Sequence, residues 1–258
     1  MTYAAAISII LISGIVAAFV TGLLHRLIEF DLRRHHHDAG SVVFLQLGVV
    51  FAVLLAFVFN EVWSEYNEAA KAIDLEISAM HGVAMIAATL EPAQAKTILV
   101  AEKAYLESVV HREWPMMEQN RKRDLETAHK FVVLVQDVAR LRLTEQQDTK
   151  AEILSLLAQA HAHRETRIFQ AKNGIPVPLW WALIGFTAVL SLFVSLSGIK
   201  YRMTAVAMAA CFTVGIVSIL VVAQLLDYPF EGALALRPEG FLEVAGKVSN
   251  LLNQVSDW

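Results

Sequence analysis

The chain has 258 residues, a formal net charge of −4 and a hydrophobic fraction of 56%, above the usual apolar content of about 45 to 50% in soluble domains. The small net charge and the lack of a basic stripe with interleaved aromatic residues exclude a nucleic-acid partner. The single cysteine, Cys211, excludes an intrachain disulfide, and the composition is that of an integral membrane protein.

Four hydrophobic stretches hold no Asp, Glu, Lys or Arg and are long enough to cross a hydrocarbon core about 30 Å thick. They cover residues 4–24, 41–59, 175–199 and 203–226. Because only helices satisfy their backbone groups within one segment in lipid, we expect four transmembrane helices in an all-α, multi-pass integral membrane protein. The expected domains are two transmembrane hairpins (1–59 and 175–226), an extramembrane helical domain (60–174) and a C-terminal tail (227–258).

The connection between the first two stretches holds three consecutive histidines, His35, His36 and His37. Imidazoles can bind transition metals, but consecutive residues of a helix do not share a face. We therefore favour a structural role over a metal site for these histidines, and the sequence predicts no cofactor.

Basic residues in short connections indicate orientation, because loops rich in Lys and Arg stay in the cytoplasm. The two short connections carry Arg26, Arg33, Arg34, Lys200 and Arg202. This distribution predicts that both short connections lie inside and residues 60–174 outside the cytoplasm. Three basic residues just before the third stretch favour the reverse orientation, which therefore stays open: Arg164, Arg167 and Lys172.

The second stretch is expected to continue out of the bilayer as a helix. From Asn60 to Leu90 there is no proline, and apolar residues recur at spacings of three and four, as in an amphipathic helix. An unbroken helix over residues 41–90 would be roughly 75 Å long at 1.5 Å per residue.

A polar group follows the point where this helix would leave the membrane: Asn60, Glu61, Ser64, Glu65 and Glu68. Like charges at i,i+4 repel on an isolated helix, but several copies around an axis would form an acidic ring that attracts cations. The preceding candidates for an apolar neck are Phe44, Phe51, Leu55 and Phe59. The alternative is a solvated face with basic partners from another helix, and for the acidic residues taken alone we favour it.

Two prolines predict breaks in the extramembrane domain, because the residue before a proline avoids the helical region. Glu91-Pro92 and Trp114-Pro115 bound an expected helix over about residues 93–113, and a further helix is expected over residues 117–143. A fourth helix is expected to end at Asn173-Gly174, a pair suited to a left-handed C-terminus.

Asp227 directly follows the fourth hydrophobic stretch and precedes Pro229 and Phe230. A carboxylate within lipid costs roughly 2.5 kcal/mol or more. We therefore expect Asp227 to cap or pair with the central domain, through Arg112 or Arg140, where the helix ends.

Motifs of the common enzyme classes are missing from the chain. It has no Walker loop, no G-x-S-x-G, no H-E-x-x-H and no cysteine pair. The sequence therefore predicts a protein that is not an enzyme.

Several local motifs together resemble the bestrophin-like family of bacterial and plant membrane proteins. They are Phe57-Val58-Phe59-Asn60-Glu61-Val62-Trp63, Tyr66-Asn67-Glu68-Ala69, Glu113-Trp114-Pro115, Pro178-Leu179-Trp180 and Leu226-Asp227-Tyr228-Pro229-Phe230-Glu231-Gly232. The resemblance extends over about residues 40–240. It implies similarity to bestrophins, which are pentameric channels whose second helices line a pore with a hydrophobic neck, and which keep the large helical region and both termini in the cytosol.

Two functions are consistent with these features. The first is a homo-oligomeric ion channel of the bacterial inner membrane, pentameric by the resemblance, whose partners are its own copies, the lipid bilayer and inorganic ions. Its acidic residues favour cations. The second is a membrane sensor or scaffold whose helical domain binds a ligand or partner. A closed ring of four or more copies would favour the channel, whereas a monomer or dimer would remove it.

Overall fold

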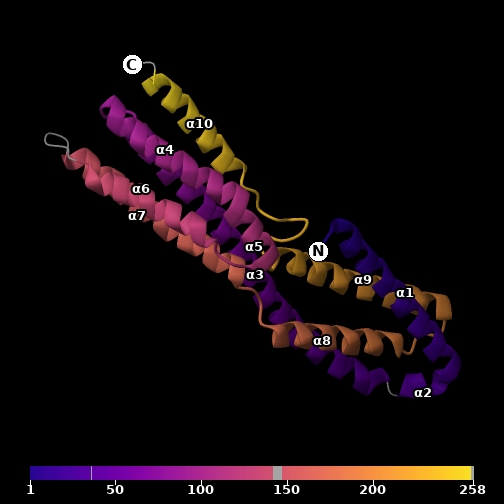
Figure 1. The fold of residues 1–258 in the computed structure, drawn as a ribbon. Helices are drawn as coiled ribbons and strands as arrows, with labels where there is room; N and C mark the ends of the chain where they lie inside the picture. The colour runs from indigo at the N-terminus through magenta and orange to yellow at the C-terminus, as the bar shows by residue number, and fades with distance from the viewer. Residues whose placement is uncertain (36, 142–146, 257–258) are drawn as a thin grey trace. The chain divides into compact units, whose positions relative to one another are not determined.

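The computed structural model describes residues 1–35, 37–141 and 147–256, and the regular elements within these ranges are all helices (Figure 1). In chain order they are α1 (Tyr3–Leu27), α2 (Phe30–His35), α3 (His37–Ala87), α4 (Pro92–Ser108), the π-helix η1 (Val109–Glu113), α5 (Trp114–Asn120), α6 (Leu125–Arg140), α7 (Gln147–Lys172), α8 (Val177–Ser195), α9 (Arg202–Leu226) and α10 (Glu239–Ser256). The chain divides into unit 1, which comprises Met1–Ser64 and Gly174–Asp227, and unit 2, which comprises Glu65–Asn173 and Tyr228–Trp258.

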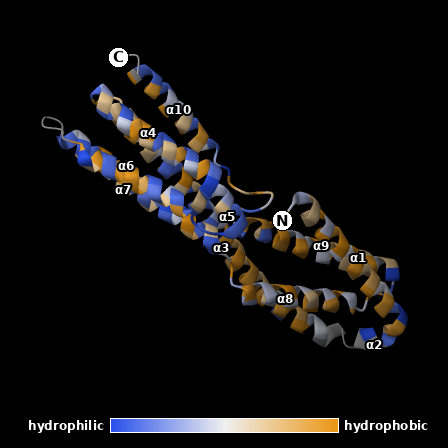
Figure 2. Ribbon diagram, viewed as in Figure 1, coloured by the Kyte–Doolittle hydropathy of each residue, from blue (hydrophilic) through white to orange (hydrophobic). Residues whose placement is uncertain are grey.

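Four helices of the described chain are long and apolar enough to cross a membrane. They are Tyr3–Leu27, Gly40–Ala87, Val177–Ser195 and Arg202–Leu226. Between 17 and 28% of the most hydrophobic window of each helix is buried inside the protein, so most of these apolar side chains face outward, as lipid contact requires. Figure 2 shows the hydrophobic colouring concentrated on these helices. The predicted all-α membrane fold is therefore confirmed.

In unit 1, small and hydroxylated residues bring α1, α8 and α9 together. A Cβ atom placed on Gly14 of α1 would lie only 2.7 Å from Val214 Cγ2 of α9, so the absent side chain permits close packing. Thr21 Oγ1 of α1 donates a hydrogen bond to Ser195 Oγ of α8 at 2.9 Å. These contacts hold the hairpins together without a charged group.

Helix α3 has 51 residues, begins in unit 1 and continues into unit 2. This confirms the prediction that the second hydrophobic stretch continues as one unbroken helix, although the helix ends at Ala87 and not at Leu90. Its later part contributes Ile73, Met80, Val83 and Ala87 to the core of unit 2. The spacings of three, four and seven place these residues on one helix face.

Helix α4 lies in the core of unit 2 and packs against both α6 and α10. We did not predict α10 from the sequence. It buries Phe241, Val244 and Val248, whose exposed fractions are 3% or less, in the same core as α4 and α6. The segment after the fourth span thus completes the hydrophobic core of unit 2.

The predicted break at Trp114-Pro115 is wrong, because the backbone stays helical from Pro92 to Asn120. Proline removes one donor and its ring would clash with the carbonyl four residues earlier in a regular helix. The π turn before it widens the helix instead, and the Trp114 N–H reaches Val109 O, five residues back. The break predicted at Glu91-Pro92 is confirmed, since α4 begins at Pro92.

The helix predicted over residues 117–143 is also wrong at its start. Helix α5 ends at Asn120, and Arg121 adopts a left-handed conformation with φ 54°. Asp124 then caps a new helix, α6, by accepting a hydrogen bond from Thr127 N at 2.9 Å. The last part of the predicted helix and the start of the next one, residues 142–146, lie outside the described residues.

Candidate functional site

The four neck candidates on α3 pack within unit 1. Phe44 lies 5.8 Å from Phe212 of α9, and Phe51 lies 6.2 Å from Phe186 of α8, measured between ring centroids. Phe51 and Leu55 are only 4% and 8% exposed, and Phe59 is half-buried. Phe44 and Phe51 thus hold α3 against α9 and α8 of the same subunit.

The opposite face of α3 is exposed in unit 1. Val49, Val53 and Phe57 follow one another at four-residue spacing and are 57%, 51% and 71% exposed. Asn60, nine residues after Phe51, lies roughly 180° around the helix from it at 3.6 residues per turn, and it is also exposed. Phe51 and Asn60 therefore lie on opposite faces of α3, whereas Phe59 lies about 100° from Asn60, between the two faces.

The five polar residues that follow the neck candidates on α3 differ in exposure and in their contacts. Asn60, Glu61 and Ser64 are exposed in unit 1. In unit 2, Glu65 is half-buried, whereas the exposed Glu68 accepts a hydrogen bond from Gln170 Nε2 of α7 at 2.9 Å. Of the two exposed glutamates, only Glu68 is thus bonded to another helix of the same subunit among the described contacts.

Asp227 is 2% exposed at the end of α9. Its Oδ1 accepts a hydrogen bond from Ile175 N at 2.7 Å, and its Oδ2 accepts one from Trp180 Nε1 at 3.3 Å. Arg112, one of its two expected partners, instead pairs with Asp124 and Glu126. Asp227 thus fixes the entry to α8 within unit 1.

The motif residues of unit 2 form an aromatic cluster. Trp114 is 4% exposed, and its ring meets Phe230 and Phe241 edge-on at 5.5 and 5.8 Å. Its Nε1 donates to Leu236 O, and Pro229 O accepts from Leu236 N at 2.8 Å. Pro115 directly follows Trp114 in the first turn of α5. These residues join the turn before α10 to α5.

Sequence reasoning missed a buried ion-pair network in unit 2. Arg167 of α7 bonds Glu76 of α3 through Nε at 2.8 Å and Glu113 of η1 through Nη2 at 2.9 Å. Arg164 bonds Glu113 as well, and Tyr105 donates to Glu76 at 2.7 Å. The four charged side chains are at most 2% exposed.

The charges of this network balance, with two carboxylates facing two guanidinium groups. Burial alone would raise the pKa of Glu113, but Arg167 and Arg164 outweigh burial and lower that pKa overall. The guanidinium of Arg167 also lies 5.4 Å above the Trp114 ring. The network therefore ties α3, η1 and α7 together through two guanidinium groups and two carboxyl groups.

Glu102 of α4 is the exception to this pairing. It is fully buried, and neither carboxyl oxygen has a hydrogen-bond partner among the described residues. Burial raises its pKa well above the usual value, because desolvation disfavours the charged form.

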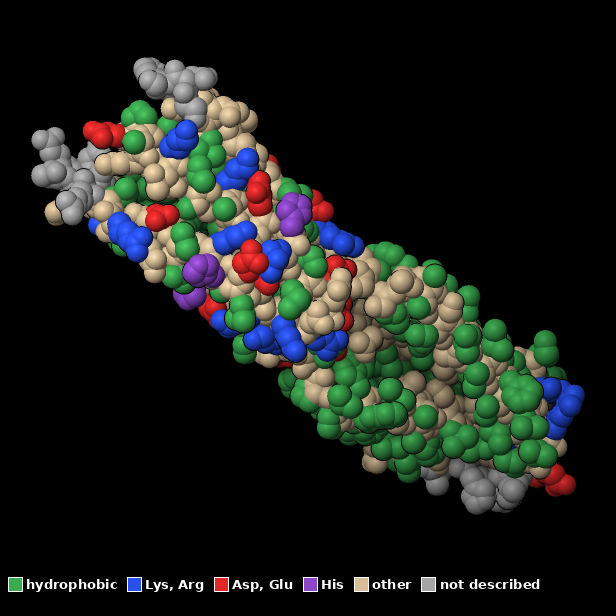
Figure 3. Space-filling model, viewed as in Figure 1, with side chains coloured by type: hydrophobic (Ala, Val, Ile, Leu, Met, Phe, Trp, Pro, Cys, Tyr) green, Lys and Arg blue, Asp and Glu red, His purple; other side chains and the backbone are tan. Residues whose placement is uncertain are grey.

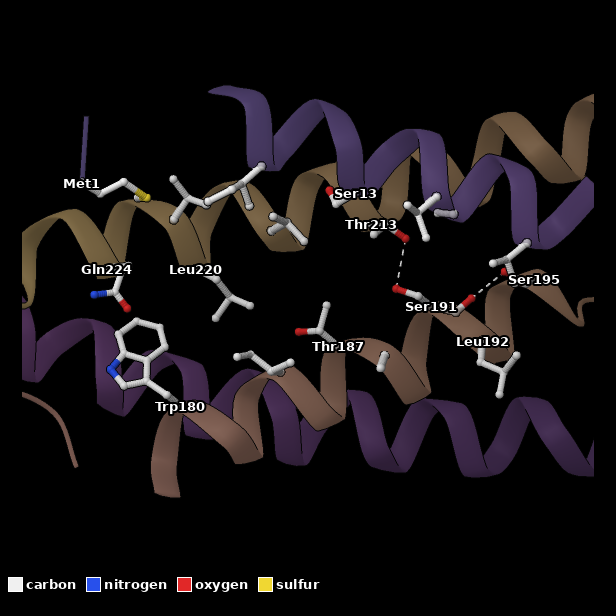
Figure 4. A pocket seen from close by; sticks show the side chains of 18 residues that line it. Met1, Ser13, Trp180, Thr187, Ser191, Leu192, Ser195, Thr213, Leu220 and Gln224 are labelled. Carbon is white, nitrogen blue, oxygen red and sulfur yellow. Dashed lines mark hydrogen bonds between the residues drawn. The ribbon is translucent and has the colours of Figure 1, made fainter. Parts of the chain in front are cut away.

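A cavity of about 690 Å³ lies within unit 1 among α1, α8 and α9 (Figure 4). The hydroxyls in its walls are engaged: Thr187 Oγ1 donates to Leu183 O at 2.8 Å, and Thr213 Oγ1 donates to Ser191 Oγ at 3.0 Å. The remaining wall is mainly apolar. Such walls offer little to replace the hydration shell of an ion, so this cavity is a poor candidate for an ion path.

Charged side chains gather over unit 2, whereas the visible surface of unit 1 is mostly hydrophobic (Figure 3). Among the described residues, no group of three or more His, Cys, Asp or Glu side chains could hold a metal ion. His36 lies outside the described residues, and the side chains of His35 and His37 are not described. A metal site at these three histidines therefore stays an open alternative.

Comparisons with known proteins show a matching family and similar solved structures. A family model described as "Bestrophin-like domain" matches residues 11–241. A bacterial bestrophin homologue from Klebsiella pneumoniae is similar in structure with a TM-score of 0.76 and 12% identity, over 96% of this chain and 98% of that one. A single-residue variant of that homologue is similar with a TM-score of 0.75 and 14% identity, over 96% of this chain and 99% of that one. No curated protein matches the chain.

Proposed function

The chain belongs to the bestrophin-like family, and from this membership we propose that it is one subunit of a homo-oligomeric ion channel in which copies of α3 surround the conduction path. A pentamer is the assembly that the resemblance to bestrophins implies. The matched family is one of membrane proteins and not of enzymes. The proposed channel is a multi-pass protein of the bacterial inner membrane, and its permeant ions are inorganic cations.

The exposed face of α3 is the observation that carries this proposal. A narrow apolar segment controls conduction by dewetting, and Val49, Val53 and Phe57 supply such a segment on one face. The exposed Asn60 and Ser64 continue the same face with polar groups. A lone subunit would present this apolar-to-polar stripe to lipid or water, whereas a ring of subunits would enclose it.

We place the neck on this stripe because Phe51 and Leu55 are already buried within their own subunit. A side chain that fills a core cannot also line a lumen without moving its helix. In this arrangement Phe44, Phe51 and Leu55 support α3 from behind, and the half-buried Phe59 lies between the two faces. The apolar walls of the cavity among α1, α8 and α9 also favour a path between subunits over one within a subunit.

Glu61 supports the preference for cations. It is exposed, lies one residue after Asn60 on α3, and makes no ion pair among the described residues. A ring of such carboxylates at a pore mouth raises the local cation concentration. Glu68 contributes less to that ring because Gln170 bonds to it.

Purified protein in a planar bilayer tests this function, after its mass has established the number of subunits. We expect Glu61→Gln to lower cation conductance about twofold or more at low ionic strength. The difference should fade at high salt, because the Debye length is about 10 Å at 0.1 M and about 3 Å at 1 M. Glu107→Gln, at an exposed position on α4, is the control.

Two results would contradict the proposal. A purified monomer or dimer leaves no ring for α3 to line. A closed ring that carries no current across a broad range of voltage, pH and calcium would instead favour the membrane sensor or scaffold whose helical domain binds a ligand or partner.

A further inference from the structure

Three basic side chains meet at the end of unit 1 where α1 ends and α9 begins. Arg33 Nη1 of α2 lies 2.6 Å from His25 Nε2 of α1. Arg202, the first residue of α9, lies beside α1, since a Cβ atom on Gly22 would be 3.1 Å from its Nη2. Both guanidinium charges act on the His25 imidazole. We refer to His25, Arg33 and Arg202 as the basic cluster.

No acidic side chain of the described residues balances the basic cluster. Arg33 is 7% exposed, and its buried Nε has no hydrogen-bond partner there. No described carboxylate lies within 4.0 Å of either guanidinium. A buried charge without a partner of opposite sign destabilises the folded state. Among the residues whose side chains the structure describes, the basic cluster therefore has no counter-anion.

The start of α9 adds further donors at this end of unit 1. Its first turn contains no acidic residue, and Tyr201 at the N-cap makes no side-chain bond to the exposed backbone N–H groups. The N-terminus of a helix carries a partial positive charge and binds anions. In the connection that leads to α9, Ser197 Oγ is likewise buried without a partner among the described residues.

We propose that the basic cluster and the N-terminus of α9 bind a phosphate group. Guanidinium groups bind phosphate oxygens in a bidentate manner, and two of them are present. His25 lies in the last turn of one span and Arg202 in the first turn of another. This is the depth at which a bilayer presents phosphodiester head groups, and basic sites between transmembrane helices bind such lipids.

The phosphate could belong to a phospholipid or to inorganic phosphate in solution. Thermal unfolding of the purified full-length chain in detergent distinguishes these sources through three additives. They are short-chain phosphatidylglycerol, diacylglycerol with the same acyl chains, and inorganic phosphate. We expect phosphatidylglycerol to raise Tm more than diacylglycerol does. If inorganic phosphate raises Tm as much as phosphatidylglycerol does, the site binds phosphate from either source. If inorganic phosphate does not raise Tm, the site binds the phospholipid.

Substitutions locate the effect. Arg202→Gln, at an exposed position, should weaken the apparent affinity for the stabilising phosphate compound by about tenfold or more. Arg33→Gln should do the same if it folds. Arg26→Gln removes an exposed charge from the same helix end and should leave the affinity unchanged. Should no phosphate compound raise Tm, or should Arg26→Gln and Arg202→Gln weaken binding equally, the basic cluster is not a phosphate site.

Discussion

Asp227 stabilises unit 1 by satisfying two donors at a helix entry. Replacement by Ala would leave Ile175 N and Trp180 Nε1 without this acceptor. We expect Asp227→Ala to destabilise the protein by about 1–3 kcal/mol and to reduce assembly, as measured by Tm and by the size of the purified complex. Asp227→Asn keeps one acceptor oxygen and should lose less. A stable, assembled Asp227→Ala channel with altered ion preference would instead place Asp227 in the conduction path.

Glu102 should make stability depend on pH in the opposite sense to most carboxyl groups. Because burial raises its folded-state pKa, the unfolded chain loses this proton first as pH rises. Stability therefore falls as pH increases from the unfolded pKa to the folded one. We expect Glu102→Gln to raise Tm at neutral pH, by roughly 2 °C or more, and the gain to grow with pH.

The matched control for Glu102 is Glu107→Gln, on the same helix. Glu107 is exposed and pairs only with Lys103 among the described residues, so its loss should change stability by less than about 0.5 kcal/mol at any pH. If Glu102→Gln is less stable than the native protein at neutral pH, the buried carboxyl is charged and paired in solution.

At the residue scale, the sequence did contain a signal for the ion-pair network. Glu76 falls within the apolar stripe of α3, between Ile73 and Met80, and Arg164 and Arg167 fall among the buried positions of α7. A charge inside an apolar stripe indicates a buried partner. Which residues would pair could not be predicted, because the partners lie 51 to 91 positions apart.

Replacement of Phe by Ala should have different effects on the two faces of α3. Phe57→Ala, on the exposed face, should widen the proposed neck and raise leak current with little change in stability. Phe51→Ala, on the packed face, should cost about 3–5 kcal/mol of stability and change conductance only through lost assembly. Bilayer recordings combined with thermal unfolding check both. A leak that appears in Phe51→Ala and not in Phe57→Ala would return the neck to the packed face.

At the scale of whole elements, the sequence predicted correctly those helices that have long hydrophobic or amphipathic runs. The four spans and the continuous α3 follow from uncharged or amphipathic runs of residues. The π turn of η1 could not be predicted from the local pattern, because its wider turn is set by Pro115 together with the packing of Trp114. Helix α10 had a visible three-four pattern, in Phe241, Val244 and Val248, that we did not read as a helix.

The neck candidates show why residue type alone does not locate a pore-lining face. Aromatic residues on α3 suggested a neck, yet aromatics also fill cores, and Phe51 packs against Phe186. A count of 3.6 residues per turn separates Phe51 from Asn60 on sequence spacing alone. Which of the two faces packs inside the subunit depends on α8 and α9, which lie far along the chain.

For the whole molecule, the orientation in the membrane can be checked by labelling. One span, α8, separates the exposed Gln119 from the exposed Lys200 along the chain. In a background with the only native cysteine removed by Cys211→Ser, single cysteines at these positions should label from opposite sides of the membrane. The basic short connections predict the cytoplasmic side for residue 200. The opposite result would fit the bestrophin arrangement, and labelling of both from one side would contradict four spans.

The core of unit 2 is built from two stretches of chain that are separated by the hairpin of α8 and α9. Helices α4 and α6 are synthesised before that hairpin, and α10, which packs on α4, is synthesised after it. The ribosome and the insertion machinery must therefore deliver two further spans into the bilayer while the partner surface for Phe241 and Val248 stays uncovered. During biosynthesis, this core can therefore close only after the hairpin of α8 and α9 has been synthesised.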